Sequence, residues 1–219
     1  MTGALPIGAP MPETDETQAA ETQAAETQAT ETQTVGAPGA EAVEVIEAPN
    51  PEEMALILVQ AGLSGRPGVL PAARALSHFG EHALGWLGIG AVGVLVSRRH
   101  RRDWLAMIAG TFAAHAAAVV IKRIVRRQRP SHPAIAVNVG TPSQLSFPSA
   151  HATSTAAAAA LMARATGSRL PWLLVPPMAL SRMVAGVHYP SDVVAGALVG
   201  TAVAATTARV ADRLAGDEA

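Results

Sequence analysis

The sequence predicts an all-α protein: an integral membrane helical bundle with five or six transmembrane helices, preceded by a disordered N-terminal tail. Three observations support this. Of the 219 residues, 49% are hydrophobic and only 15% charged, although the first quarter of the chain is polar. The rest of the chain consists of apolar runs separated by short basic segments. There is no cysteine, which excludes disulfide scaffolds and zinc fingers.

The formal net charge of −1 conceals two segments of opposite charge. Residues 1–53 contain eleven acids and no base, whereas the remainder contains sixteen bases and six acids, so −11 and +10 give −1. From Glu16 a Glu-Thr-Gln motif recurs every five residues, which suits neither a helix nor a strand. Because little apolar surface can be buried there, we expect residues 1–52 to form a disordered acidic tail, either an interaction segment or a solvated extension. Residues 53–215 are expected to form the membrane-embedded domain.

Several apolar runs approach the length that a membrane span requires. Ala83–Val96, Trp104–Ile121 and Val193–Ala208 carry no charge, and the second has eighteen residues against the ~20 needed. Ala152–Ala163 is rich in alanine, and Leu170–Val187 contains two prolines and an arginine, so both are expected to face other helices or a polar cavity. A water-soluble bundle would need more polar helix faces. Small residues expected to let helices approach closely are Gly88, Gly90, Gly93, Gly196 and Gly200.

Residues 54–75 decide between five and six spans. Met54–Leu63 is apolar but only ten residues long, and Arg66 and Pro67 follow closely. The stretch is therefore either a short first membrane helix or an amphipathic segment at the membrane surface.

The first of three polar clusters follows the second strong span. Lys122 and Arg129 are seven residues apart, which on a helix places them on one face about 10 Å apart. Pro130 is expected to end that helix. Alone, such a basic run is most simply a topological anchor.

The second cluster, Phe147 to His151, leads into the alanine-rich run. Pro148 and Ser149 indicate a helix N-terminus, whose free amides and positive dipole end could hold an anion, with Ser149 as a further donor. His151 would lie beside that anion. Alone, this histidine is equally explained as a polar residue at the membrane interface.

The third cluster runs from Ser181 to Asp192. Pro190 marks a helix start, so Asp192 lies in the first turn and can reach His188. A carboxylate on Nδ1 fixes the tautomer and leaves Nε2 free as a nucleophile. Arg182 is the only charge in its apolar run, and a bound phosphate would be a suitable partner for it.

Together these clusters resemble the three-part signature of the type 2 phosphatidic acid phosphatase and haloperoxidase superfamily. The motifs are Lys122-x6-Arg129-Pro130, Pro148-Ser149-Ala150-His151 and Ser181-Arg182-x5-His188-x3-Asp192. Their order and spacing fit, and the resemblance covers roughly residues 83–213. The second motif usually reads Pro-Ser-Gly-His. Ala150 in place of the glycine matters only if that position needs a positive φ.

The resemblance implies a role for each motif residue. Five positions would hold the phosphate oxygens: Lys122, Arg129, Ser149, the amide of Ala150, and Arg182. His188 would attack phosphorus to give a phosphohistidine, Asp192 would orient it, and His151 would protonate the leaving alcohol. No cofactor and no metal are expected, because three cations can stabilise the transferring phosphoryl group and the acids outside the tail are scattered. His115, two turns before Lys122 on the same helix face, could support the site residues from beside them, although a packing role is favoured.

Counting bases on each side predicts the orientation. Eight bases fall on the side opposite the motifs: Arg98, Arg99, Arg101, Arg102, Arg164, Arg169, Arg209 and Arg213. The motif side keeps three, Arg123, Arg126 and Arg127, once the phosphate ligands are set aside. Because bases are enriched on the cytoplasmic side, we expect a multi-pass protein of the cell membrane whose motifs face the extracytoplasmic side.

A phosphate site at membrane helix ends favours a lipid-linked phosphate substrate among membrane lipids, with no nucleic acid as partner; protein partners stay open. The compact body most resembles bacterial polyprenyl-lipid phosphatases, in particular those acting on decaprenylphosphoryl-5-phosphoribose in cell-wall arabinan synthesis. That implies products of decaprenylphosphoryl-ribose and phosphate. It also implies the family's usual six helices, with residues 54–75 as the first. The alternatives are an undecaprenyl-diphosphate or phosphatidylglycerophosphate phosphatase, a haloperoxidase, and a catalytically silent membrane binding protein.

Overall fold

The structure, a computed structural model, describes residues 47–216, and these confirm the predicted all-α class. The disorder predicted for residues 1–52 falls almost wholly on residues 1–46, outside the described part of the chain. The α-helices are α2 (Pro51–Leu63), α3 (Val69–Gly80), α4 (Leu84–Val96), α5 (Arg101–Val125), α6 (Ala150–Thr166), α7 (Val175–Val184) and α8 (Pro190–Gly216). Two 3-10 helices, η1 (Glu81–Ala83) and η2 (Leu170–Leu174), precede α4 and α7.

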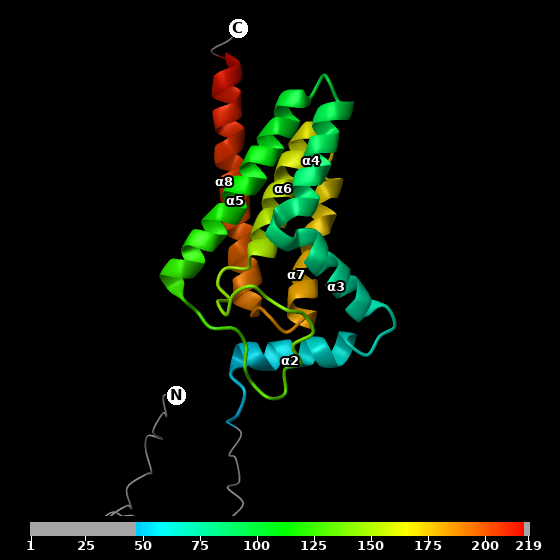
Figure 1. Cartoon of the computed structure of the whole chain (residues 1–219), viewed down its shortest axis with the longest axis vertical. Coiled ribbons are helices and arrows are strands. Elements are labelled where there is room, and N and C mark those ends of the chain that lie inside the picture. Colours follow the sequence, from blue (N-terminus) through cyan, green and yellow to red (C-terminus); the bar gives the residue numbers. More distant parts are fainter. Residues whose placement is uncertain (1–46, 217–219) are drawn as a thin grey trace, which may run out of the picture. The chain divides into compact units, whose positions relative to one another are not determined.

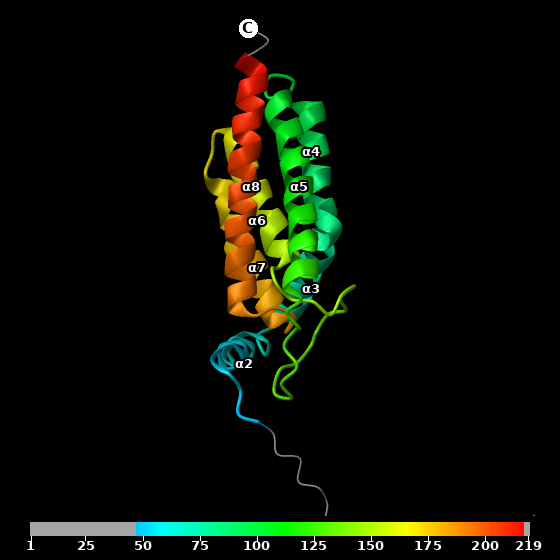
Figure 2. The same ribbon diagram turned by 90° about the vertical axis from the view of Figure 1, so that its left-hand side faces the viewer.

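Helices α4 to α8 run roughly along one axis, whereas α2 lies across one end of the bundle (Figures 1 and 2). The 24-residue connection between α5 and α6 folds over that same end (Figure 1). All three motifs therefore meet at one end of the bundle, because α5 finishes there and α6 and α8 begin there.

Helix α6 forms the centre of the bundle, packed between α5, α7 and α8. Its residues 152–159 are all buried, so this alanine-rich helix is covered on every side, as expected for a helix without a polar face. Its small side chains let α8 approach closely: a Cβ at Gly200 would lie 2.1 Å from the Thr153 carbonyl oxygen. The close approach predicted at Gly90, Gly93, Gly196 and Gly200 is confirmed. It is wrong for Gly88, where a Cβ would meet nothing within 4 Å.

Three helical segments of the described chain are long and apolar enough to cross a membrane: Val69–Val96, Arg101–Val125 and Pro190–Gly216. Leu170–Val184 is a shorter apolar helix. The outer surfaces of these helices expose large apolar side chains, among them Val92, Leu95, Phe112, Ile124, Leu173, Val194, Leu198 and Leu214. An exterior of this kind suits lipid rather than water.

The expectation of one first helix over residues 54–75 is wrong. The chain turns at residues 64–68, where Gly68 at φ 83° ends the connection between α2 and α3. Helix α3 then continues through the kink at η1 into α4, so residues 69–96 form one kinked segment. At the kink His82 and Ala83 have φ of 50° and 61°, the left-handed region that glycine favours.

Helix α2 is held against the end of the bundle by the side chain of Gln60. Its amide nitrogen donates to the carbonyl oxygens of Ala136 (2.7 Å) and Val184 (3.1 Å), and its oxygen accepts from the Ala136 amide (3.0 Å). The chain leaves α7 through Gly186, where φ is 73° and a Cβ would lie 2.2 Å from the Ala136 oxygen. Only glycine fits there, so the turn that carries His188 is fixed in place.

Candidate active site

Arg129 lies in the loop after α5 and not on the helix, which corrects the sequence expectation. Helix α5 ends at Val125 because Arg126 adopts a left-handed conformation (φ 55°), four residues before Pro130. Arg129 is held by carbonyl oxygens instead. Its Nε donates to Ser143 (2.8 Å) and its Nη1 to Val187 (2.6 Å).

Lys122 and Arg182 are the other two cations of the predicted phosphate site, and both are buried. Lys122 Nζ donates to the carbonyl oxygens of Leu145 (3.0 Å) and Ser146 (2.8 Å). Arg182, on α7, donates to the Ser77 hydroxyl (2.6 Å). Within residues 47–216 neither these two nor Arg129 forms an ion pair with a carboxylate. Three positive charges are thus gathered with no carboxylate paired directly to any of them in the described chain, an arrangement suited to a phosphate ligand.

The second motif begins α6, as predicted. Ser149 is the N-cap: its side chain accepts a hydrogen bond from the Ala152 amide, at 3.4 Å. Ala150 opens the helix and is not among the described residues with positive φ, so replacing the family's glycine causes no backbone strain. Ala150 lines the cavity described below, whereas Ser149 is fully buried behind it.

His188 and Asp192 lie together, as the third motif predicts. Asp192 is in the first turn of α8, and its Oδ2 lies 3.6 Å from His188 Nδ1. Arg129 Nη1 lies 3.4 Å from His188 Nε2. Because a guanidinium can only donate, this contact requires Nε2 to be unprotonated and Nδ1 to carry the hydrogen that faces Asp192. That is the tautomer a nucleophilic Nε2 needs.

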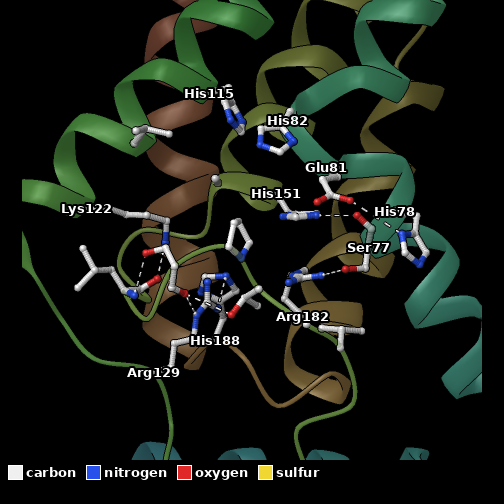
Figure 3. Close-up of a pocket in the computed structure, with 18 of the residues that line it drawn as sticks. Ser77, His78, Glu81, His82, His115, Lys122, Arg129, His151, Arg182 and His188 are labelled. Carbon is white, nitrogen blue, oxygen red and sulfur yellow. Dashed lines mark hydrogen bonds and ion pairs between the residues drawn. The ribbon is translucent and has the colours of Figure 1, made fainter. Parts of the chain in front are cut away.

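A cavity of about 970 Å³ joins the motifs at this end of the bundle (Figure 3). Six of the eight predicted site residues line it: Lys122, Arg129, Ala150, His151, Arg182 and His188. Asp192 and Ser149 do not line the cavity and are fully buried. His115 also lines the cavity, although the sequence favoured a packing role for it.

Helix α3 also contributes to the site, which no pattern in the sequence indicates. The Ser77 carbonyl oxygen accepts from His151 Nε2 (2.9 Å), while the Ser77 hydroxyl accepts from Arg182. Gly80 allows this approach, because a Cβ there would lie 2.5 Å from His151 Cδ2. Ser77 therefore orients one predicted phosphate ligand and the predicted acid together.

The sequence places Arg127 among the free bases, yet in the structure it contacts the carboxylate of Asp192. Its Nη1 donates to Asp192 Oδ1 (3.1 Å), its Nη2 pairs with Glu52 of α2, and its guanidinium lies 4.0 Å from the Tyr189 ring centre. Burial alone would raise the pKa of Glu52, but hydrogen bonds from Ser191 and Arg127 lower it, so Glu52 is ionised at neutral pH. Helix α2 is thereby linked to Asp192 through Arg127.

Replacing Arg127 is expected to lower kcat more than it changes KM. Asp192 keeps the Tyr189 amide (2.8 Å) but loses its charged partner, so Arg127→Met should cost roughly tenfold in kcat. Glu52→Gln should act in the same direction with a smaller effect, and Arg127→Lys should restore part of the loss. Steady-state kinetics of the three variants test this. A change in KM alone would show that Arg127 serves substrate binding instead.

The electrostatics of His188 predict the pH dependence. Burial, then the positive charges of Arg129, Arg182 and Lys122, lower the pKa of His188 well below 6.5. The imidazole is therefore neutral at neutral pH, and kcat/KM should fall only as the pH drops through that lowered pKa. Arg129→Gln removes one of these charges, so the acid limb should move to higher pH even though activity also drops. An acid limb that stays in place would contradict this.

Fold and site together define a membrane phosphohydrolase of the kind predicted. The family model described as the PAP2 superfamily matches residues 103–215. The chain belongs to this superfamily. A Mycolicibacterium smegmatis protein named decaprenylphosphoryl-5-phosphoribose phosphatase is 69% identical over 150 residues, which cover 68% of this chain and 83% of the relative. A Mycobacterium tuberculosis protein of the same name is 61% identical over 169 residues, which cover 77% and 93%.

Two crystal structures share the fold. The transmembrane PAP2 type phosphatidylglycerolphosphate phosphatase of Bacillus subtilis matches with a TM-score of 0.59 at 21% identity, over 75% of this chain and 88% of that chain. LpxE of Aquifex aeolicus matches with a TM-score of 0.55 at 19% identity, over 75% and 99%. At these identities the likeness concerns the fold alone.

Proposed function

We propose that this protein hydrolyses the 5-phosphate of decaprenylphosphoryl-5-phosphoribose, releasing decaprenylphosphoryl-ribose and phosphate. The observation that carries the proposal is the meeting of three motifs around one cavity, in a chain that covers 83% and 93% of relatives with that named activity. A lipid-linked substrate also suits the apolar exterior of the bundle, which would let a polyprenyl chain stay in the bilayer while its head group enters the cavity.

The reaction proceeds by two displacements at phosphorus. The 5-phosphate is held by Lys122, Arg129 and Arg182, with the amide of Ala150 at the N-terminus of α6. Nε2 of His188 attacks phosphorus and the bond from phosphorus to the ribose oxygen breaks. His151, protonated on both ring nitrogens when the phosphate is bound, gives that oxygen the proton of Nε2 and becomes neutral. The leaving oxygen takes the place of the Ser77 carbonyl at Nε2 of His151.

Water then completes the cycle. His151 removes a proton from a water molecule, whose oxygen attacks the phosphohistidine; the phosphorus–nitrogen bond breaks and phosphate leaves. Asp192 faces Nδ1 of His188 throughout and stabilises the positive charge that develops on the ring. Charge stabilisation and positioning supply the catalysis, as in phosphoryl transfer generally.

The test is phosphate release from a panel of purified lipids. Decaprenylphosphoryl-5-phosphoribose should be the best substrate of the purified protein, ahead of undecaprenyl diphosphate and phosphatidylglycerophosphate. A preference for either of the latter would replace the substrate assignment. No release from any lipid would favour a catalytically silent binding protein.

In the proposed orientation the chain crosses the membrane five times and the cavity lies on the extracytoplasmic side. The five crossings are α3 with α4, then α5, α6, η2 with α7, and α8. Figure 1 places the α4–α5 connection and the ends of α6 and α8 at the end of the bundle away from α2. The eight bases counted from the sequence belong to these segments, which supports a cytoplasmic location for that end.

Single-cysteine labelling tests this orientation, since the chain has no cysteine of its own. Gly140 lies in the loop over the cavity, where a Cβ meets nothing within 4 Å, and Arg99 lies in the exposed α4–α5 connection. In intact cells a membrane-impermeant maleimide should label Gly140→Cys and leave Arg99→Cys unlabelled. The opposite pattern would place the active site in the cytoplasm.

A further inference from the structure

The cavity extends beyond the motif residues to polar side chains that the proposed reaction does not use. Glu81 and His82 come from the kink between α3 and α4, and His115 comes from the middle of α5. Figure 3 shows Glu81 beside His151, and His82 with His115 on the side of His151 away from His188. Ionisable side chains within membrane helices are costly and usually mark a functional site.

His115 has hydrogen-bonding capacity that its neighbours leave unused. Within the described chain, His115 Nδ1 is buried and has no hydrogen-bond partner. The His82 ring centre lies 6.0 Å from that of His115, so the two imidazoles border the same part of the cavity. Glu81 pairs with His78 at 3.9 Å, a contact between two solvent-accessible side chains. Buried polar atoms are normally satisfied, so a polar ligand is expected here.

The backbone at the kink supports the same conclusion. His82 and Ala83 are consecutive non-glycine residues in the left-handed region, a strained conformation that persists where the surrounding structure imposes it and that is common at ligand sites. Ala83 is fully buried and Gly80 packs against the ring of His151, so the kink is fixed beside the catalytic histidine. The kink gives Glu81 and His82 their places on the cavity wall.

The geometry of phosphoryl transfer decides which part of the substrate lies here. The entering and leaving atoms are roughly in line through phosphorus, so the leaving group lies on the far side of the phosphate from His188. His151, which protonates the leaving oxygen, is on that side. Beyond His151 the cavity wall is formed by Glu81, His82 and His115.

We infer that Glu81, His82 and His115 form the subsite that binds the leaving sugar, with the carboxylate and the imidazoles hydrogen-bonded to ribose hydroxyls. The inference rests on the proposed function, because it takes the leaving group to be a sugar. A carboxylate accepts from two neighbouring hydroxyls at once, and an imidazole can donate or accept. Enzymes that hydrogen-bond substrate hydroxyls discriminate against substrates that lack them. This subsite would therefore favour a phosphoribosyl lipid over other lipid phosphates.

Two inhibitors separate the sugar subsite from the phosphate site. Decaprenylphosphoryl-ribose carries the sugar without the 5-phosphate, and orthovanadate mimics the transferring phosphoryl group without a sugar. Glu81→Gln and His82→Asn, each in the full-length protein, should weaken inhibition by decaprenylphosphoryl-ribose by roughly tenfold and leave inhibition by orthovanadate unchanged. Asparagine is chosen because it tolerates the left-handed backbone at position 82.

Glu47→Gln and His100→Asn serve as matched controls, since both residues are exposed and lie outside the cavity lining. Both compounds should inhibit these control variants as strongly as they inhibit the wild type. Equal weakening of both inhibitors in the Glu81 and His82 variants, or no weakening of either, would overturn the sugar subsite. A wild-type protein that does not hydrolyse decaprenylphosphoryl-5-phosphoribose would instead contradict the proposed function, and the subsite with it. Thermal melting of each variant identifies losses that come from misfolding.

Discussion

Replacing His188 by asparagine should lower kcat by about a thousandfold or more while the protein still folds and binds phosphate analogues. The expectation follows from the position of Nε2, which faces the cavity 3.4 Å from Arg129 Nη1, with Nδ1 facing Asp192. Asparagine fills part of the same space but offers no nucleophilic nitrogen. The three cations proposed to hold the phosphate remain, so the variant should still bind orthovanadate.

Two measurements separate this account from a structural role for His188. The first is turnover of decaprenylphosphoryl-5-phosphoribose, and the second is the rise in melting temperature that orthovanadate produces. If His188 is the nucleophile, His188→Asn loses turnover and keeps the rise in melting temperature with orthovanadate. If kcat stays within a few-fold of the wild type, His188 is not the nucleophile.

Replacing Arg182 by methionine should abolish most activity without weakening the fold. Arg182 is 2% exposed; its hydrogen bond to Ser77 is at 2.6 Å, and within the described residues its Nε has no partner. Burying such a charge is costly unless an anion compensates it, and methionine matches the apolar part of the side chain. We therefore expect kcat/KM to fall by about a thousandfold and the melting temperature of the ligand-free protein to stay the same or rise.

Arg169→Met is the matched control for this variant. Arg169 is exposed at the other end of the bundle, so the same change there should leave kcat/KM at the wild-type value. Orthovanadate should raise the melting temperature of the control but not of Arg182→Met. A large fall in melting temperature of the ligand-free Arg182→Met protein would mean that Arg182 stabilises the fold rather than serving the ligand.

The motifs could be predicted from the sequence because each is local. Asp192 follows His188 by four positions, and Ser149 caps the helix that follows it, so spacing alone indicates these contacts. The helix starts at Ala150 and Pro190 follow the same local rules. The membrane helices could also be predicted from the sequence, since they depend on charge-free apolar runs.

The contacts that the sequence did not reveal join residues far apart in the chain. Arg127 and Asp192 are 65 residues apart, and Ser77 and Arg182 are 105 apart. The residues around each member of these pairs do not indicate which distant residue it contacts. Pro130 predicts a helix that runs as far as Arg129, whereas the left-handed conformation of Arg126 ends α5 earlier. Left-handed residues other than glycine are rare, so neither this end nor the kink at His82 was foreseeable.

The central claim is that His188 receives the 5-phosphate of a lipid-linked phosphoribose. The most direct measurement mixes the protein with decaprenylphosphoryl-5-phosphoribose labelled with ³²P at the 5-phosphate, stops the reaction in alkali during the first turnover, and locates the label. We predict an alkali-stable, acid-labile label on the peptide that contains His188, absent from His188→Asn. Release of labelled phosphate during that first turnover with no labelled protein, or with the label on another residue, would contradict the account.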